Sequence, residues 1–265
     1  MSINSVQRPC PICKNKVSKA LPLYSFEKWN VVQCTKCSMV YLQNTATYID
    51  LEIDYSWDKT YFKEANLREK KRGILKRIAK AVRIINYRLK QSDHDRYLKI
   101  LGPGKILDIG CGDVVRWKSP FIPFGIEISK NLSKSADIKM KKLGGKCLQG
   151  PGAKKIWDFN KNQFDSIMMH SYLEHEVEII SILDGSYRCL RPNGKIFIRV
   201  PNFNSLNRKV SKNKWPGLRY PDHVNYFTVN TLKSLAEKTN FKFQLINSHK
   251  IWLDDNIQAV LTKQN

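Results

Sequence analysis

Short apolar runs, separated by longer mixed stretches, fill the second half of the chain. They are KILDIG (105–110), FGIEI (124–128), FDSIMMH (164–170) and GKIFIRV (194–200). The stretches between them are long enough for helices or compact connections. This alternation predicts an α/β domain in which parallel strands form a doubly wound sheet.

The residues around these runs predict the helices and the closing strands. Residues 176–190 are a predicted helix that ends at RPNG (191–194), a turn containing Pro and Gly. Residues 229–240 are a further predicted helix. FKFQLINSHKIW (241–252) and IQAVLTK (257–263) are predicted as two closing strands.

Two CxxC pairs stand near the N-terminus, with Cys10 and Cys13 in CPIC and Cys34 and Cys37 in CTKC. This spacing is typical of a tetrahedral zinc site, in which each tight turn directs two thiolates at one ion. Four thiolates complete the coordination of zinc, so the expected ion is structural rather than catalytic. Two disulfides are the alternative, which a reducing compartment disfavours.

The cysteine pairs predict a small zinc ribbon over residues 1–45. VVQC (31–34) and SMVYL (38–42) read as its short strands. A module of this size buries little apolar surface, so the metal is expected to supply most of its folding free energy. From the amino to the carboxyl terminus, the predicted order of domains is this ribbon, a connector at 46–100, and the α/β domain at 101–265.

The connector contains a strongly basic segment at residues 67–90. Its apolar residues recur at spacings of three and four, as on one face of a helix, while Lys and Arg occupy most other positions. The segment is therefore a predicted basic amphipathic helix. Docking on the core, contact with an anionic membrane surface and contact with a polyanionic substrate all remain open for it.

Composition bears on the location of the protein and on its partners. No apolar run approaches the ~20 residues of a membrane span, and the N-terminal residues lack the apolar core of a signal peptide, so a cytoplasmic location is expected. The formal net charge is +23, from 46 basic and 23 acidic residues. Such an excess favours anionic partners and says little about fold.

The first strand of the α/β domain ends in an unusual way. Asp108 is followed by Gly110 and Gly112, separated by one residue. Ligands of doubly wound sheets bind at the carboxyl ends of strands, where glycine lets the backbone approach closely and adopt positive φ. Glu127 ends the second strand, a position suited to hydrogen bonds with ribose hydroxyls.

These residues favour an adenosine-type cofactor. A dinucleotide site expects GxGxxG, and the turn here lacks the third glycine because Val115 stands at that position. S-adenosylmethionine carries no phosphate and needs no pyrophosphate-binding turn. The pattern therefore favours S-adenosylmethionine over a nicotinamide dinucleotide.

Five segments occur in an order that resembles class I S-adenosylmethionine-dependent methyltransferases, and most closely those with an N-terminal zinc ribbon. They are ILDIGCGD, FGIEIS, FDSIMMHSYLEH, LRPNGKIFIRVPN and DHVNYFTVNTLKSLAEKTNF. The resemblance implies a Rossmann-like seven-stranded sheet with an antiparallel last strand. It also implies cofactor contacts at Asp108, Gly110, Gly112 and Glu127, with the loop that starts at His170 beside the methionine part.

The chain departs from that family in the connection after the glycine turn. Val114 stands where another glycine is usual, and Pro151 stands where an acidic residue often contacts the adenine. The stretch from 112 to 125 is also short and contains two prolines. We therefore expect the first helix of the domain to be abbreviated or absent.

Two histidines are candidate general bases for the acceptor. His175, in HSYLEH, follows the fourth strand, and His223, in YPDHVNYF, lies in a loop after the fifth. Imidazole is the commonest base for a hydroxyl acceptor. The structural alternatives are packing of His175 with Glu174 and pairing of His223 with Asp222.

The expected function is methylation, at oxygen or carbon, of a sugar-containing or related small metabolite. The basic composition favours an anionic acceptor such as a nucleotide-sugar or a glycan. RNA is the competing acceptor, because a zinc ribbon with a basic helix also suits nucleic acid. A degenerate domain that binds S-adenosylmethionine without turnover is the non-enzymatic alternative.

Overall fold

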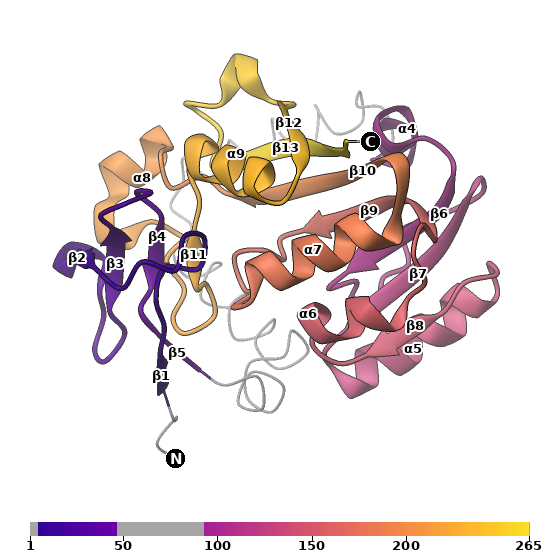
Figure 1. Ribbon diagram of the computed structural model, residues 1–265, viewed down its shortest axis with the longest axis horizontal. Coiled ribbons are helices and arrows are strands. Elements are labelled where there is room, and N and C mark those ends of the chain that lie inside the picture. The colour runs from indigo at the N-terminus through magenta and orange to yellow at the C-terminus, as the bar shows by residue number, and fades with distance from the viewer. Residues whose placement is uncertain (1–4, 47–92, 265) are drawn as a thin grey trace, which may run out of the picture.

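A computed structural model of the chain describes residues 5–46 and 93–264 (Figure 1). A small N-terminal sheet lies beside a larger sheet with helices packed on it. The predicted basic helix at 67–90 and most of the connector at 46–100 lie outside the described residues.

The larger sheet has seven strands, in the spatial order β12-β13-β10-β9-β6-β7-β8. The strands are β6 (Gly104–Ile109), β7 (Phe121–Glu127), β8 (Cys147–Gln149), β9 (Phe164–His170), β10 (Leu190–Pro201), β12 (Phe241–Leu245) and β13 (Asn256–Lys263). β6 to β10 pair in parallel, whereas β13 is antiparallel to both of its neighbours. This confirms the doubly wound, Rossmann-like sheet with an antiparallel last strand.

The winding of the sheet reverses at β6, which lies between β7 and β9. The chain adds β7 and β8 on one side of β6 and then returns to add β9 and β10 on the other. Ligands of doubly wound sheets bind in the crevice outside the carboxyl ends of the strands at such a point. The turn 110–112 and Glu127 stand there, at the ends of β6 and β7.

Alternate residues of the central strands pack on opposite faces of the sheet. The helices are α4 (Asp93–Leu101), α5 (Lys130–Lys141), α6 (Gly152–Lys155), α7 (Ile179–Cys189), α8 (Leu206–Ser211) and α9 (Val229–Lys238). Leu107 and Ile109 are fully buried in the core that includes α6, α7 and α9. Ile106 and Met168 face the other side, with Tyr97 of α4. Each such buried side chain contributes about 1.5–3 kcal/mol.

The connection from β6 to β7, residues 110–120, contains no helix, as the short proline-containing stretch predicted. Trp117 takes over part of the role of the missing helix. Its side chain is buried and packs edge-on or tilted against Tyr97 of α4 and Phe121 of β7, with ring centroids 5.8 and 5.1 Å away. One indole thus covers sheet surface that a helix usually covers.

Two predicted boundaries were wrong. Residues 191–194, expected to separate helix from strand, lie inside β10 at an irregularity of its pairing with β9, where Asn193 has a φ of 60°. The strand expected over 241–252 ends at Leu245. The side chain of Asn247 then bonds to the backbone of β13, which stops the ladder, and a short 3-10 turn follows.

The N-terminal sheet with its cysteine turns, residues 5–46, is called the ribbon below. Its strands are β1 (Ser5–Gln7), β2 (Ser18–Ala20), β3 (Val31–Cys34), β4 (Val40–Leu42) and β5 (Asn44–Ala46), with a 3-10 turn at Pro22–Tyr24. β1 pairs with β5, and β2, β3 and β4 form a sheet whose fourth strand is β11 (Asn225–Tyr226). β11 comes from the segment between β10 and α9, so the later chain completes the ribbon sheet (Figure 1).

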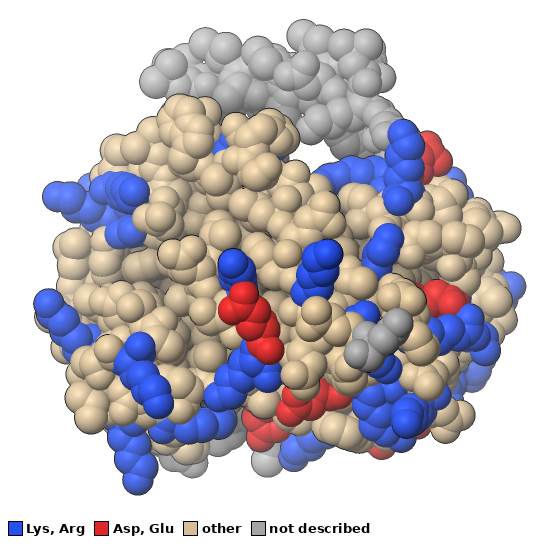
Figure 2. Space-filling model, turned by 45° about the horizontal axis from the view of Figure 1, so that its top comes forward, with Lys and Arg blue, Asp and Glu red and all other residues tan. Residues whose placement is uncertain are grey.

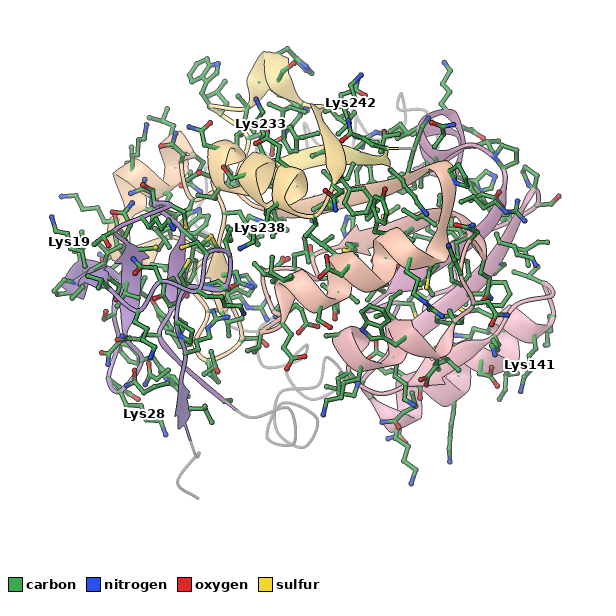
Figure 3. The ribbon with its side chains drawn as sticks, in the orientation of Figure 1. Lys19, Lys28, Lys141, Lys233, Lys238 and Lys242 are labelled. Carbon is green, nitrogen blue, oxygen red and sulfur yellow. The ribbon has the colours of Figure 1, made fainter. Side chains whose placement is uncertain are left out.

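Side chains also tie the ribbon to the larger domain. The Arg8 guanidinium donates to the carbonyl oxygens of Leu42 within the ribbon, at 3.0 Å, and of Val224 outside it. Burial lowers the pKa of Arg8 to about 10. Lys238 of α9 donates to the carbonyl of Ile12, between the first two cysteines (Figure 3). The two parts therefore share hydrogen bonds as well as a sheet.

Candidate functional site

The turn after β6 and the carboxylate at the end of β7 face each other. The Gly112 N–H donates to Glu127 Oε2 at 2.8 Å, and the Ser129 N–H donates to Oε1 at 3.0 Å. Glu127 is buried, with 5% of its surface exposed. Two backbone donors fix the carboxylate against the turn, so the predicted cofactor residues Gly112 and Glu127 lie together.

The two glycines of the turn are required for different reasons. Both have positive φ, 71° at Gly110 and 60° at Gly112. A Cβ at Gly110 would lie 2.9 Å from the ring of Tyr172, whereas a Cβ at Gly112 would meet no atom within 4 Å. Gly110 therefore makes room for a packed ring, and Gly112 leaves open space in front of the turn.

Asp108 has partners within the chain. Its Oδ2 accepts a hydrogen bond from Trp117 Nε1 at 2.9 Å and lies 3.8 Å from Arg116 Nε. Burial raises the pKa of Asp108, and the Arg116 charge opposes that shift. Sequence reasoning missed both partners, although a Trp and an Arg shortly after a buried carboxylate were the available signal.

His170 ends β9, next to β6 in the sheet. Burial, together with the charges of Arg199 and Arg116, lowers the pKa of His170 to about 4. Its imidazole is therefore neutral at ordinary pH. Because Arg116 also pairs with Asp108, His170 and the turn after β6 share one electrostatic environment.

The loop after β9 brings His175 next to His223. The two rings lie edge to face with centroids 4.7 Å apart. Nδ1 of His175 lies 3.0 Å from the Asp222 carbonyl, and Nδ1 of His223 lies 2.8 Å from the Gly217 carbonyl. A carbonyl only accepts, so both Nδ1 atoms carry hydrogen, and the remaining ring nitrogen of a neutral imidazole here is an acceptor.

Charges around the pair separate the two histidines. Burial disfavours the charged form of His175, but the Asp222 carboxylate 3.4 Å away outweighs it and raises the pKa of His175. Burial and the neighbouring His175 lower the pKa of His223 well below its usual range. Asp222, expected as a partner of His223, instead faces His175 and Arg219, whose Nη2 lies 2.6 Å away. His223 is thus the neutral imidazole of the pair.

Two buried residues near the histidine pair hold loops in place. Asn225 donates to the carbonyls of Leu173 and Glu176 and so fixes the loop that carries His175. Trp215 is buried against Phe203 in a core cluster of the ribbon side. Both contacts match a packing role.

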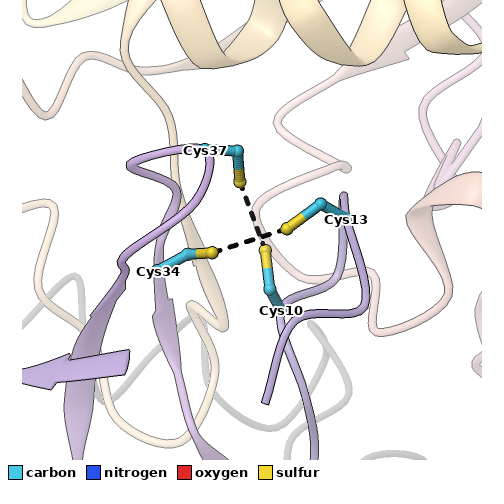
Figure 4. A group of neighbouring side chains, drawn as sticks. All are labelled: Cys10, Cys13, Cys34 and Cys37. Atoms are coloured by element: carbon cyan, nitrogen blue, oxygen red, sulfur yellow. Dashed lines mark hydrogen bonds between the residues drawn. The ribbon is translucent and has the colours of Figure 1, made fainter. Parts of the chain in front are cut away.

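The four ribbon cysteines converge on one point (Figure 4). Their sulfur atoms all lie within 4.8 Å of one another, with Cys10–Cys37 and Cys13–Cys34 distances of 3.4 Å. Sulfurs bound to one tetrahedral zinc ion lie about 3.8 Å apart, given Zn–S bonds of about 2.3 Å. The donor set and its spacing fit a structural zinc ion.

The two cysteine turns repeat one backbone design. The residue after each second cysteine, Lys14 and Ser38, has positive φ and donates its N–H to the carbonyl of the first cysteine. In the second turn, the Lys36 N–H also lies 3.4 Å from Cys34 Sγ. Such donors stabilise a thiolate.

Positive charge is distributed over the molecule. Lys and Arg side chains are spread across the face in Figure 2, with fewer Asp and Glu side chains among them. The lysines labelled in Figure 3 lie on both parts, for example Lys19 on β2 and Lys141 on α5. Among the described residues, no helix combines the length and apolar composition that crossing a bilayer requires.

The fold and the glycine turn are those of class I S-adenosylmethionine-dependent methyltransferases. The family described as methyltransferase domain matches residues 82–245. The match spans more than half of the chain, so the chain belongs to that family.

The chain is also similar to an individual relative and to solved structures. An uncharacterized protein of Methanocaldococcus jannaschii is 26% identical over 140 residues, which span 52% of this chain and 65% of that protein. A SAM-dependent methyltransferase from Archaeoglobus fulgidus superposes with a TM-score of 0.51 at 17% identity, over 68% of this chain and 94% of that one. Phosphoethanolamine N-methyltransferase 2 of Haemonchus contortus, in complex with S-adenosyl-L-methionine, superposes with a TM-score of 0.46 at 16% identity. The superposition covers 64% of this chain and 52% of that one.

Proposed function

We propose that the chain transfers a methyl group from S-adenosylmethionine to an oxygen or carbon atom of a sugar-containing or related small metabolite. The observation that carries the proposal is the Glu127 carboxylate held against the Gly112 turn at the switch point of the sheet. Family membership supports the cofactor, and the residues beside the turn support where it binds.

On the cofactor side, five residues have assigned roles in this proposal: Asp108, Gly110, Gly112, Glu127 and His170. Two backbone N–H groups hold the Glu127 carboxylate in place, and we assign its oxygens to the ribose hydroxyls. Gly112 admits the ligand to the open side of the turn. Bound S-adenosylmethionine supplies an electrophilic methyl group, which leaves its electron pair on sulfur.

On the acceptor side, we assign the acceptor's proton to His175 and His223. The neutral His223 imidazole has a ring nitrogen available as acceptor, because its Nδ1 hydrogen points to Gly217. The Asp222 carboxylate holds His175 in position and stabilises its charged form. Positioning and exclusion of water then account for much of the expected acceleration.

We further propose that residues 1–45 are a structural zinc ribbon for a catalytic domain at 101–265. The four cysteines fill the coordination of one ion and leave no open position for a substrate. The shared sheet between β4 and β11 supports a ribbon that holds the segment carrying His223. The role of the ribbon is therefore to position the acceptor side.

The test is transfer of label from methyl-tritiated S-adenosylmethionine into two separate pools, a small-metabolite extract and total RNA. The proposal predicts label in the metabolite pool and at least about a tenfold loss with His223→Ala, since a general base contributes about 10²–10⁴-fold. Label in RNA alone would assign the acceptor to nucleic acid. Absence of label in both pools, with no cofactor binding, would support the non-catalytic alternative.

A further inference from the structure

One carboxylate beside the histidine pair lacks a partner. Glu174 is 1% exposed, and its Oε2 atom has no hydrogen-bond partner among the described residues. A buried carboxylate oxygen without a donor is costly, because the charged form loses its hydration without compensation. Burial raises the pKa of Glu174, and the charges of His175, Arg199 and Arg219 oppose that rise, but no group donates to Oε2, which leaves this oxygen open to a proton or to a cation.

The two imidazoles lie where a cation would need its other ligands. A carboxylate oxygen of Glu174 and one ring nitrogen each of His175 and His223 lie within 4.8 Å of one another. Ligands on one divalent ion with bonds of about 2.1 Å lie about 3–3.5 Å apart, so the three groups lie at most about 1–2 Å farther apart than bound ligands do.

The outer contacts of the imidazoles are those of metal-binding histidines. Each Nδ1 donates to a backbone carbonyl, that of Asp222 for His175 and that of Gly217 for His223. Ligating histidines almost always donate their other ring N–H to a carbonyl or carboxylate, which fixes the ring and its tautomer. The same contacts leave the other nitrogen of each ring available as a ligand.

From these observations we propose that Glu174, His175 and His223 bind a divalent first-row metal ion. Two imidazoles and one carboxylate are the ligand set of open zinc and iron sites. The His175 side chain is 30% exposed, so the cluster has a side open to solvent. Three protein ligands leave a fourth coordination position for a further ligand, unlike the closed set of four ribbon cysteines.

The catalytic role of the metal ion rests on the proposed function, whereas binding of the ion does not. A divalent ion lowers the pKa of a hydroxyl that binds to it. An acceptor hydroxyl bound at the open side would lose its proton to solvent, and its oxygen would bond to the methyl carbon as the methyl–sulfur bond breaks and leaves its electron pair on sulfur. With the ion bound, the ring nitrogens of His175 and His223 are ligands, so loss of the proton from the bound hydroxyl replaces the direct transfer to His223 that is proposed above for the site without metal.

The experiment is a titration of the zinc-loaded protein with Co²⁺, followed by its visible spectrum and by elemental analysis. We expect one ion per chain beyond the ribbon zinc, with a spectrum that lacks the sulfur charge-transfer bands of a thiolate site. Glu174→Gln should weaken this second ion at least about a hundredfold, since loss of an outer-shell partner alone costs about 10–100-fold. Glu178→Gln, an exposed residue of the same loop, is the matched control and should bind as the unmodified protein does.

A measurement on the unmodified protein keeps the proposal testable if Glu174→Gln fails to fold. Zn²⁺ added to the zinc-loaded chain should shift the ring ¹⁵N resonances of His175 and His223 and leave those of His249 unchanged. No ion beyond the ribbon zinc at millimolar Co²⁺, Zn²⁺ or Mn²⁺ would overturn the proposal, as would equal binding by Glu174→Gln. S-adenosylhomocysteine binding is measured separately, so loss of the metal site alone leaves the proposed function standing.

Discussion

The ribbon and the seven-stranded sheet are stabilised in different ways. The sheet buries apolar side chains on both faces, from Leu107 and Ile109 on one side to Ile106 and Met168 on the other. The ribbon has short strands, four converging cysteines and a last strand borrowed from the larger domain. A domain with a large core is stable through burial, whereas a small module needs a metal and a neighbour.

The largest expected effect comes from removing a metal ligand in the ribbon. Cys34→Ser should abolish zinc binding and unfold the ribbon, because structural zinc supplies about 10–16 kcal/mol in small metal-dependent modules. Elemental analysis and near-ultraviolet circular dichroism measure the loss. The far-ultraviolet signal of the sheet should persist. Cys147→Ser, at a cysteine of β8, is the control and should keep its zinc; equal zinc loss in both variants would contradict the assignment.

A smaller effect is expected at the glycine turn of the sheet, where Gly110→Ala and Gly112→Ala form a matched pair. Each substitution places an alanine where the backbone has positive φ, which lowers the free energy of unfolding by about 1–3 kcal/mol. Only Gly110→Ala also drives a methyl group into the ring of Tyr172, adding about 1–3 kcal/mol of overpacking. Thermal or urea unfolding should rank Gly110→Ala below Gly112→Ala in stability. Equal stability of the two would show that the ring does not pack there.

Arg8→Ala tests the hydrogen bonds between the two regions. The substitution leaves the carbonyls of Leu42 and Val224 without their charged donor, at a cost of about 1.5–3 kcal/mol. Amide exchange at β4 and β11 should accelerate, while exchange in β6 stays slow. Lys19→Ala, an exposed residue of the same ribbon, should change neither.

The smallest expected effect lies on α5, which belongs to neither of the two proposed metal sites. Asp137 accepts a hydrogen bond from the Cys147 N–H at 3.0 Å and forms an ion pair with Lys141 at 2.6 Å. Burial alone would raise the pKa of Asp137, but these two contacts outweigh it and lower the pKa. Asp137→Asn should cost less than about 1 kcal/mol, because the pair is partly exposed. A lowered pKa stabilises the fold above the unfolded-state value of about 4, so the difference between variant and parent should shrink as pH falls from that value through the lower folded-state pKa. A difference that stays constant as the pH is lowered below about 4 would argue against this origin.

The sequence predicted the features that depend on local pattern. Apolar runs gave the strands of the sheet, and the spacing of Asp108, Gly110 and Gly112 located the turn. CxxC spacing likewise located the cysteine cluster, since each tight turn fixes its own two ligands. These features are encoded within a few consecutive residues.

Features that depend on distant residues escaped prediction. Trp117 replaces a helix only because the sheet face and α4 meet it in space. β11 pairs with β4 from about two thirds of the chain length away, and Asp222 faces His175 rather than the adjacent His223. Two-residue strands and side-chain pairing across loops leave no periodic signal, so only the folded structure reveals them.

Titration calorimetry with S-adenosylhomocysteine tests whether Glu127 and the Gly112 turn form the cofactor site. The unmodified chain should bind one equivalent, and Glu127→Ala should bind at least about tenfold more weakly, because hydrogen bonds to a charged group contribute about 1.5–3 kcal/mol. Glu237→Ala, on the exposed face of α9, should bind as the unmodified chain does. No binding by the unmodified chain, or full affinity in a folded Glu127→Ala variant, would contradict a cofactor site built from Glu127 and the Gly112 turn.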